Sequence, residues 1–349
     1  MNRRDLLRLA AVTGAATALS SAHAAPKAAP VAGPLVISSG NGVRVVAKAG
    51  EIIAGGGDPL DAVIAGVNIL EDDPDDMTVG YGGIPNEEGV VQLDASVMDG
   101  RTMKSGAVGA LERVRHPSRV ARLVMERTDR AFLVGAGALK FAVAHGFTDE
   151  NLLTPRARKV WLHWRETLAT HDDWNESTVI DPDVKWFIEK YGPDNFRPQG
   201  TVHCAARTTS GDFAGVTTTS GLFFKMPGRL GDSPVIGAGL YLDNDIGSCG
   251  STGWGEANIR SCGSHTVIEY LRAGKSPKDA ALETLARIQH ITKDTRFLDA
   301  KGRVKNNVTF YVIAKDGRVG AASMWKGNKY QLHGGGAVKE VACDFLHEA

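Results

Sequence analysis

The stretch that decides the fold is residues 200–221, which read GTVHCAARTTSGDFAGVTTTSG. Residues 201–207 and 212–220 are rich in Thr and Val, two residue types that favour strands. Residues 208–211 (TTSG) supply a Ser-Gly turn between them, so the stretch predicts a β-hairpin. The preceding residues 193–200 (PDNFRPQG) have the composition of an exposed loop. Thr201 therefore stands where a loop becomes a strand.

Around this hairpin, predicted strands follow strands and predicted helices follow helices. We expect further strands over residues 34–39, 90–98, 103–109, 235–242, 245–250, 307–314 and 319–324. We expect helices over residues 43–54, 59–71, 118–126, 131–145, 155–170, 182–190, 255–273 and 277–290. This grouping favours an α+β fold, with antiparallel sheets covered by helices, over alternating βαβ units. The acidic residues 71–76, at the end of one helix, are predicted to be solvated.

The composition is that of an ordinary globular protein with room for a large core. The 349 residues are 43% hydrophobic and include 40 basic and 40 acidic residues. A net charge of zero gives no support for nucleic acid or an anionic membrane as a partner. The ten histidines are scattered, without HxH or HxxxH pairs beside carboxylates, so we predict no metal site.

The N-terminus has the features of an export signal. Arg3 and Arg4 precede an apolar run over residues 6–19, and residues 22–24 (AHA) fit a small-residue cleavage site. The arginine pair is typical of a twin-arginine signal. We therefore expect residues 1–24 to be removed, residues 25–33 to be a disordered lead-in, and the mature protein to be periplasmic and not membrane-bound.

Four cysteines remain in the mature chain, and they allow three disulfide pairings. Twin-arginine routes carry folded protein out of a reducing cytosol, which favours buried free thiols over disulfides. The four positions are Cys204, Cys249, Cys262 and Cys343.

Several blocks of the sequence match one known family in the order in which that family carries them. They are EDDPDDMTVGYGG (71–83), LDASVMDG (93–100), LVGAGAL (133–139), TVHCAA (201–206), TTSG (218–221), GRLGDSPVIGAGLY (228–241) and STGWGE (251–256). From about residue 34 to residue 322 the chain resembles the glycosylasparaginases, which are N-terminal nucleophile (Ntn) hydrolases. The resemblance implies a single domain over residues 34–349 with a four-layer αββα fold, in which two antiparallel sheets lie between helical layers.

The same resemblance implies that the chain cleaves itself between Gly200 and Thr201. The products would be an α chain of residues 25–200 and a β chain of residues 201–349. Thr201 matches the family nucleophile, and its freed α-amine, with a pKa of about 7.7–8.0, could take the hydroxyl proton. Thr219 matches a threonine that orients this nucleophile. The family needs no metal or organic cofactor, and its αβ units often pair, so we expect a homodimer.

The substrate-binding residues follow from the resemblance as well. Arg229 matches a residue that binds the α-carboxylate of the substrate, for which a guanidinium fork is suited. Asp232 matches the partner of the α-ammonium group. Thr252 and Gly253 match an oxyanion hole, made of a hydroxyl and a backbone N–H. The implied substrate is a small molecule, N4-(β-N-acetylglucosaminyl)-L-asparagine, whose side-chain amide is hydrolysed to release aspartate.

Three positions depart from the glycosylasparaginase pattern. Gly200 stands where that branch usually has Asp, and Gly-Thr is the pattern of plant-type asparaginases and isoaspartyl peptidases. Gly40 stands near the position of a family Trp on the sugar side, and His203 replaces a family Gly. An isoaspartyl peptidase with L-asparaginase activity is therefore an alternative. A non-enzymatic alternative is a periplasmic protein that binds amino acids through Arg229 and Asp232.

Overall fold

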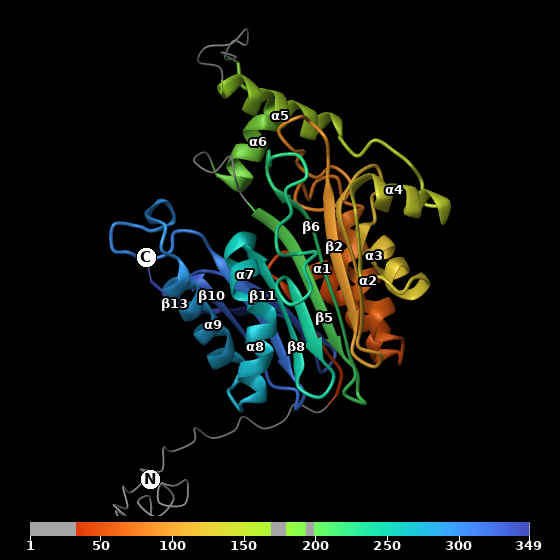
Figure 1. The fold of residues 1–349 in the computed structure, drawn as a ribbon, viewed down its shortest axis with the longest axis vertical. Coiled ribbons are helices and arrows are strands. Elements are labelled where there is room, and N and C mark those ends of the chain that lie inside the picture. The colour runs from red at the N-terminus through yellow and green to blue at the C-terminus, as the bar shows by residue number, and fades with distance from the viewer. Residues whose placement is uncertain (1–32, 169–178, 193–198, 349) are drawn as a thin grey trace, which may run out of the picture.

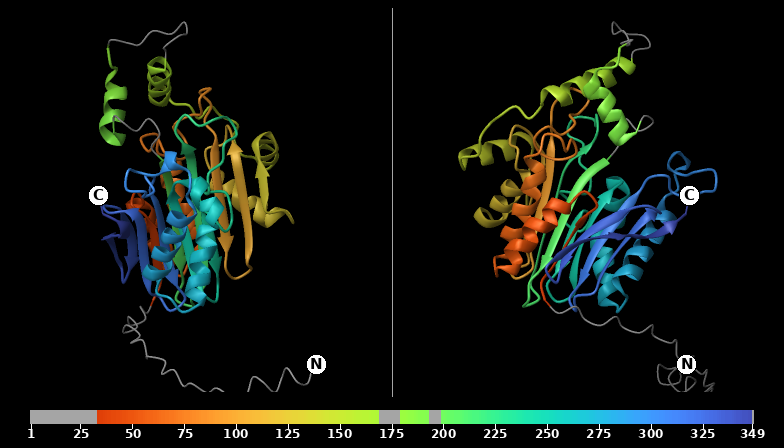
Figure 2. Two further views of the ribbon diagram at one scale, coloured as in Figure 1. Left: turned by 60° about the vertical axis from the view of Figure 1, so that its left-hand side comes forward. Right: turned by 180° about the vertical axis from the view of Figure 1, so that it is seen from behind.

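The computed structural model describes residues 33–168, 179–192 and 199–348 (Figure 1). The expected signal peptide lies outside the described residues, as does the expected lead-in except for Gly33. Two sheets stack face to face, and helices cover the outer face of each, as the edge-on views in Figure 2 show. The α+β class and the four-layer αββα arrangement predicted from the sequence are confirmed.

The larger sheet has eight strands in the order β12-β11-β1-β5-β6-β2-β3-β4. The predicted hairpin forms its two central strands, β5 and β6. The strand bounds are β1 Leu35–Ser39, β2 Leu93–Asp99, β3 Lys104–Leu111, β4 Phe132–Val134, β5 Gln199–Arg207, β6 Phe213–Leu222, β11 Lys329–Gly334 and β12 Ala337–Ala342.

The smaller sheet has five strands in the order β13-β10-β9-β8-β7. Their bounds are β7 Leu240–Asp243, β8 Gly247–Gly253, β9 Val308–Ala314, β10 Val319–Trp325 and β13 Asp344–His347. An apolar cluster between the two sheets includes Ile37 of β1, Phe213 of β6 and Ile313 of β9, so the sheets share a core.

One helical layer packs on the outer face of the larger sheet through a buried apolar cluster. It consists of α1 Val43–Ala54, α2 Pro59–Glu71, α3 Pro117–Arg127 and α4 Gly135–Ala144. The other layer covers the smaller sheet and consists of α7 Gly255–Ser261, α8 Gly263–Arg272 and α9 Pro277–Ile291. Two further helices, α5 Pro155–Thr167 and α6 Pro182–Tyr191, stand at one end of the sandwich (Figure 2).

The alternation of side chains along β5 fixes the direction of Thr201. Val202 and Cys204 belong to the apolar cluster under the outer helices, whereas Ala205 belongs to the cluster between the sheets. Because successive strand residues point to opposite faces, Thr201 and His203 share the inner face with Ala205. The expected nucleophile therefore faces the second sheet.

Three of the expected elements begin more than three residues late or are interrupted. The helix expected over residues 131–145 begins only at Gly135, because Phe132–Val134 form an edge strand parallel to β3. The helix expected over residues 255–273 is broken at Cys262, whose φ of 48° is left-handed. The strand expected over residues 235–242 begins only at Leu240, because hydrogen-bonded turns precede it.

The sheets also differ from the expectation in the number and direction of their strands. Both are antiparallel inside, but each has one parallel pair at an edge, β3–β4 and β10–β13. Three strands after residue 325 were not predicted, because their sequences alternate weakly and mix charge with glycine. β11 nevertheless pairs directly with β1, which places a wall of the larger sheet beside residues 38–41.

The acidic run is only partly solvated, since Glu71 is fully buried. Its carboxylate accepts hydrogen bonds from Ser118 Oγ and Thr218 Oγ1, both at 2.8 Å, and from Asn68 Nδ2 at 2.6 Å. Burial raises the pKa of Glu71, and the hydrogen bonds from Thr218 and Ser118 oppose the shift. The network ties α2 and α3 to β6 one residue before Thr219.

Candidate active site

Thr201 sits at an irregularity in the central hairpin. Gly200 pairs with Gly221, and Val202 pairs with Thr218, so Thr201 faces two residues of β6, Thr219 and Ser220. Such bulges change the direction of a side chain relative to the regular ladder. The half-buried Thr201 Oγ1 donates a hydrogen bond to Thr219 Oγ1 at 3.2 Å, so the structure brings the two predicted threonines together.

The Thr219 hydroxyl has three partners. It accepts from Thr201 Oγ1 and from the backbone N–H of Gly221 at 2.8 Å, and it donates to the carbonyl oxygen of Gly200. Thr219 is 1% exposed, so these bonds are shielded from water. One hydroxyl therefore contacts both sides of the peptide bond at which cleavage is predicted.

Gly200 is packed so closely that no larger residue fits without rearrangement. A Cβ atom built on Gly200 would lie 1.8 Å from Cβ and 2.7 Å from Oγ1 of Thr78. The Thr78 hydroxyl donates to Asp76, and the Thr78 carbonyl accepts from the Ser220 backbone at 2.8 Å. Thr78 was not predicted as a site residue, although it lies in the matched block of residues 71–83. Thr78 occupies the space that a side chain at position 200 would need.

Arg229 is held by Glu256, another residue that was not predicted from the sequence. Its Nε and Nη2 donate to Glu256 Oε1 at 2.9 and 2.8 Å. Its Nη1 lies 3.2 Å and 3.5 Å from the Cβ positions built on Gly231 and Gly221, respectively. Glu256 therefore fixes the guanidinium plane while Nη1 faces the glycine-lined cavity beside Thr201.

Asp232 is 4% exposed and lines the same cavity as Arg229. Its Oδ2 accepts from Ser251 Oγ at 2.5 Å and from Asn258 Nδ2 at 2.8 Å. Burial raises the pKa of Asp232, while these bonds and the charge of Arg229 act in the other direction. With Oδ2 occupied, Oδ1 is the atom available to a bound ammonium group.

A second buried cation lies near Arg229. Lys225 is 2% exposed, and its Nζ donates to the Gln92 carbonyl at 3.0 Å and lies 3.5 Å from Asp94 Oδ2. Burial lowers the pKa of Lys225, and the nearby Arg229 charge lowers it further. Lys225 Nζ is 3.0 Å from the Cβ position built on Gly221. Two cations thus flank Gly221, on the side expected to bind a carboxylate.

Two cavities meet at Thr201. The smaller has a volume of about 10 Å³, roughly the space of one water molecule. It is lined by five of the predicted site residues together with four neighbours: Thr201, Thr219, Arg229, Asp232, Gly253, Gly221, Leu222, Gly231 and Ser233. The larger has a volume of about 720 Å³ and opens on the other side of Thr201.

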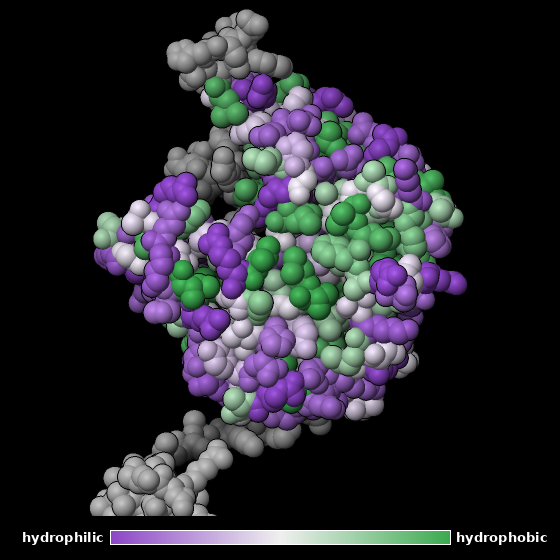
Figure 3. Space-filling view, viewed as in Figure 1, coloured by the Kyte–Doolittle hydropathy of each residue, from purple (hydrophilic) through white to green (hydrophobic). Residues whose placement is uncertain are grey.

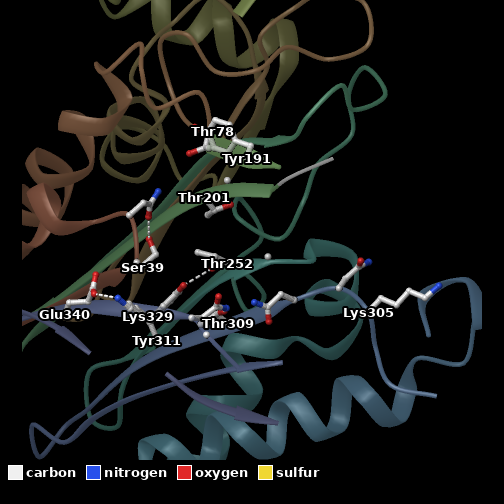
Figure 4. A pocket seen from close by; sticks show the side chains of 18 residues that line it. Ser39, Thr78, Tyr191, Thr201, Thr252, Lys305, Thr309, Tyr311, Lys329 and Glu340 are labelled. Atoms are coloured by element: carbon white, nitrogen blue, oxygen red, sulfur yellow. Dashed lines mark hydrogen bonds and ion pairs between the residues drawn. The ribbon is translucent and has the colours of Figure 1, made fainter. Parts of the chain in front are cut away.

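The larger cavity is polar and includes Thr252, the other expected oxyanion-hole residue. Figure 4 shows Thr78 and Tyr191 beside Thr201 at one wall, with Thr252, Tyr311 and Lys329 across from them. Amide, hydroxyl and charged side chains dominate the lining, including Asn41, Asn306, Asn307, Asn328, Lys305 and Glu340. Such a wall suits a ligand rich in hydrogen-bonding groups.

The three departures from the family pattern have defined places in the structure. Gly200 packs on Thr78. A Cβ on Gly40 would lie 2.9 Å from the Lys329 carbonyl oxygen, so β11 leaves no space there for an aromatic side chain. His203 is fully buried between the sheets and lines neither cavity.

Comparison with known proteins places the chain in a family. Residues 35–314 match the family model described as asparaginase. The chain belongs to the asparaginase family. Among its asparaginase-family relatives, the N(4)-(beta-N-acetylglucosaminyl)-L-asparaginase of Elizabethkingia miricola is 36% identical over 339 residues, which cover 95% of this chain and 92% of that protein. The relationship to glycosylasparaginases expected from the sequence is confirmed.

Other members of the asparaginase family are similarly related. The protein of the same name from Rattus norvegicus is 36% identical, covering 73% of this chain and 77% of its own. An isoaspartyl peptidase/L-asparaginase from Bos taurus is also 36% identical, covering 72% and 76%. Sequence identity alone therefore does not separate the two activities.

The described part of the chain bears on three other expectations. It contains no helix long and apolar enough to cross a membrane. It contains no cluster of three or more His, Cys, Asp or Glu side chains that could hold a metal ion. All four cysteines lie in it as free thiols; three are buried, but Cys262 is exposed, contrary to the prediction.

Proposed function

We propose that this protein hydrolyses the side-chain amide of N4-(β-N-acetylglucosaminyl)-L-asparagine, using Thr201 as a nucleophile released by self-cleavage after Gly200. The observation that carries the proposal is the small cavity in which Thr201, Thr219, Arg229, Asp232 and Gly253 meet. A cavity lined by a hydroxyl, a cation and a carboxylate suits an amino acid whose α-carboxylate and α-ammonium groups are both free. The relatives named for this activity support the choice of substrate.

The proposed reaction begins with self-cleavage. Thr201 Oγ1 attacks the Gly200 carbonyl carbon, whose oxygen accepts a hydrogen bond from Thr219. In an N-to-O acyl shift the C–N bond breaks and the hydroxyl proton passes to nitrogen, which frees the Thr201 amine and leaves Gly200 as an ester on Oγ1. Water hydrolyses this ester to give the Gly200 carboxylate and the Thr201 hydroxyl. Gly200 lines the larger cavity beside Thr201, so departure of the Gly200 end would widen the path from this cavity to the smaller one.

The substrate then binds with its α-carboxylate at Arg229 and its α-ammonium at Asp232. The Thr201 amine takes the Oγ1 proton, and Oγ1 attacks the side-chain amide carbon. Thr252 and Gly253 stabilise the oxygen that becomes negative. The amide nitrogen leaves with the proton as a glycosylamine, and a β-aspartyl ester remains on Thr201. Water hydrolyses this ester to release aspartate.

The larger cavity supports a leaving group bigger than ammonia. Its volume of about 720 Å³ lies within the range of sites for drug-sized ligands. Its amides and hydroxyls match the many donors and acceptors of a sugar. Because Gly40 carries no aromatic ring, no stacking is expected at that position, and the polar side chains of the lining would hold the sugar through hydrogen bonds.

Isoaspartyl peptidase with L-asparaginase activity is the second candidate. It is favoured by Gly200 before the nucleophile and by the bovine relative of that name. In this case the larger cavity would accept the amino acid released from a β-aspartyl dipeptide. Self-cleavage, binding of the α groups and attack by Thr201 would use the same residues as in the first candidate.

A side-by-side assay separates the two candidates. Purified protein is given glycosylated asparagine and β-aspartyl-leucine at equal concentrations, and aspartate release is measured. We expect kcat/KM to be at least tenfold higher for glycosylated asparagine. A higher value for the dipeptide would reverse the assignment, while binding of aspartate without any turnover would favour an amino-acid-binding protein.

We further propose that the protein is exported to the periplasm and acts as a homodimer of processed units. The export proposal rests on Arg3, Arg4 and the cleavage site after Ala24. The dimer proposal is supported by exposed apolar side chains at Phe132, Val134 and Val143. Figure 3 shows apolar side chains gathered on this face, over the region of α3, α4 and β2. Sedimentation of the protein with and without Val134→Asp would test the dimer.

A further inference from the structure

A buried tyrosine contacts one of the expected oxyanion-hole residues. Tyr311 Oη and Thr252 Oγ1 are 2.8 Å apart. Thr252 pairs with Thr309, and Tyr311 pairs with Gly250, so these residues occupy neighbouring positions on one face of β8 and β9. Tyr311 is 3% exposed and also lines the larger cavity, as Figure 4 shows. The contact is thus shielded from water but lies beside the reacting centre.

We propose that Tyr311 is a positioning residue. Its hydroxyl donates a hydrogen bond to Thr252 Oγ1, and this bond directs the hydroxyl hydrogen of Thr252 toward the reacting carbonyl oxygen. The inference rests on the proposed function. A phenol is a stronger hydrogen-bond donor than an aliphatic alcohol, so the proton between the two oxygens belongs to Tyr311. Thr252 Oγ1 then accepts one bond and keeps its own proton for the oxygen that becomes negative.

Burial supports this direction of donation. It raises the pKa of Tyr311 above its ordinary value, so the phenol keeps its proton throughout the pH range in which the enzyme would work. A hydroxyl that accepts one hydrogen bond becomes a better donor in the next, because the chain polarises cooperatively. Tyr311 would therefore both orient Thr252 and strengthen it as a donor.

His203, one of the departures from the family pattern, holds the Tyr311 ring in place. The two rings are nearly parallel, at an interplanar angle of 12° and a centroid distance of 6.0 Å. Thr217 Oγ1 donates to the Gly239 carbonyl at 3.1 Å, so it accepts from His203 Nδ1 at 2.9 Å. This bond fixes the plane of the imidazole from the larger sheet.

In the smaller sheet, the missing side chain of Gly250 leaves space for the His203 ring. A Cβ built on Gly250 would lie 2.0 Å from His203 Nδ1, so only glycine allows the imidazole to reach between the sheets. Because Gly250 is the strand partner of Tyr311, the space and the stacked ring come from adjacent strands. His203, Gly250 and Tyr311 therefore form one packed unit across the interface between the sheets.

The test is a double-mutant cycle with Tyr311→Phe, Thr252→Ala and the double variant. Tyr311→Phe keeps the ring and its stacking and removes only Oη. The substrate is a β-aspartyl anilide, whose hydrolysis does not depend on the preferred leaving group, and rates are divided by the amount of cleaved chain. Tyr330→Phe is the matched control, because Tyr330 is also buried between the sheets but lines neither cavity.

We expect Tyr311→Phe to lower kcat about tenfold with KM within twofold, as loss of one buried hydrogen bond would. In the Thr252→Ala background, Tyr311→Phe should cause no further loss. Equal losses in both backgrounds, or no loss in either, would overturn the inference. A wild type that hydrolyses the anilide but not glycosylated asparagine would contradict only the proposed substrate.

Discussion

The hydroxyl of Thr219 donates a hydrogen bond to the carbonyl oxygen of Gly200, while it accepts one from Thr201 Oγ1 at 3.2 Å. A donor on this carbonyl would stabilise the negative charge that develops when Thr201 attacks it. Thr219→Val removes the donor and keeps the shape. We expect self-cleavage to slow by about a hundredfold, the usual cost of losing such a donor.

The time course of cleavage in freshly synthesised chain, followed on a denaturing gel, measures this effect. Thr219→Ser keeps a hydroxyl and should cleave at a rate close to that of the wild type. If Thr219→Val cleaves as fast as Thr219→Ser, the hydrogen bond has no part in cleavage.

A second prediction concerns the space around Gly200. Gly200→Ala would place Cβ 1.8 Å from Thr78 Cβ, which forces the backbone beside Thr201 to move. We expect at least a tenfold loss in cleavage rate. The double variant Gly200→Ala/Thr78→Gly removes the clash and should recover most of the rate.

Gly137→Ala is the matched control for this substitution, because nothing lies within 4 Å of its Cβ position. It should cleave normally. Failure of Thr78→Gly to rescue Gly200→Ala would show that the requirement at position 200 is not one of space. The gel assay described for Thr219 serves here as well.

Recognition of the α-carboxylate gives a third prediction. Arg229→Lys keeps the charge but loses the planar fork that Glu256 aligns through two hydrogen bonds. We expect KM for a β-aspartyl anilide to rise at least tenfold. The variant should also lose its preference for this substrate over the matching α-carboxamide, whereas the wild type should discriminate strongly. Equal discrimination in both proteins would place the carboxylate elsewhere.

The sequence predicted the residues that carry recognisable chemistry in matched blocks. Thr201, Thr219, Arg229 and Asp232 meet at one cavity because a central hairpin and the loop after it bring them together. Their partners were harder to find. Thr78 and Glu256 lie in matched blocks, but each contacts residues that are distant in the sequence. A local sequence pattern does not predict such contacts.

Other features could not be predicted because they depend on how the two sheets stack. Tyr311 reads as an ordinary residue of a buried strand, and only the stacked sheets place it against His203 and Thr252. Similarly, Lys225 reads as a surface lysine, but the structure buries it beside Asp94. The helix expected over residues 131–145 begins late because residues 132–134 pair with β3, a tertiary effect that overrides local propensity.

A fourth prediction follows from the burial of His203. Desolvation lowers its pKa from 6.5 to about 3, so between these values the unfolded chain binds a proton that the folded chain does not. The stabilising contribution of the neutral imidazole is therefore complete above pH 6.5 and is lost as the pH falls toward 3. The slope is at most about 1.4 kcal/mol per pH unit.

Urea unfolding of the uncut Thr201→Ala variant at pH 7.5 to 4.5 measures this contribution, with Thr201→Ala/His203→Gln for comparison. Other groups, including Glu71 with its raised pKa, contribute equally to both proteins and cancel in the difference. We expect the stability advantage of the histidine form to shrink as the pH falls. A difference that does not vary with pH would mean that His203 is accessible to protons in the folded state.

The central claim is that Thr201 becomes an N-terminal nucleophile, and the intact mass of the purified protein under denaturing conditions tests it most directly. We predict two masses that correspond to a break between Gly200 and Thr201, and a single uncut mass with no hydrolysis for Thr201→Ala. A single uncut mass in a wild-type preparation that hydrolyses β-aspartyl amides would contradict the claim.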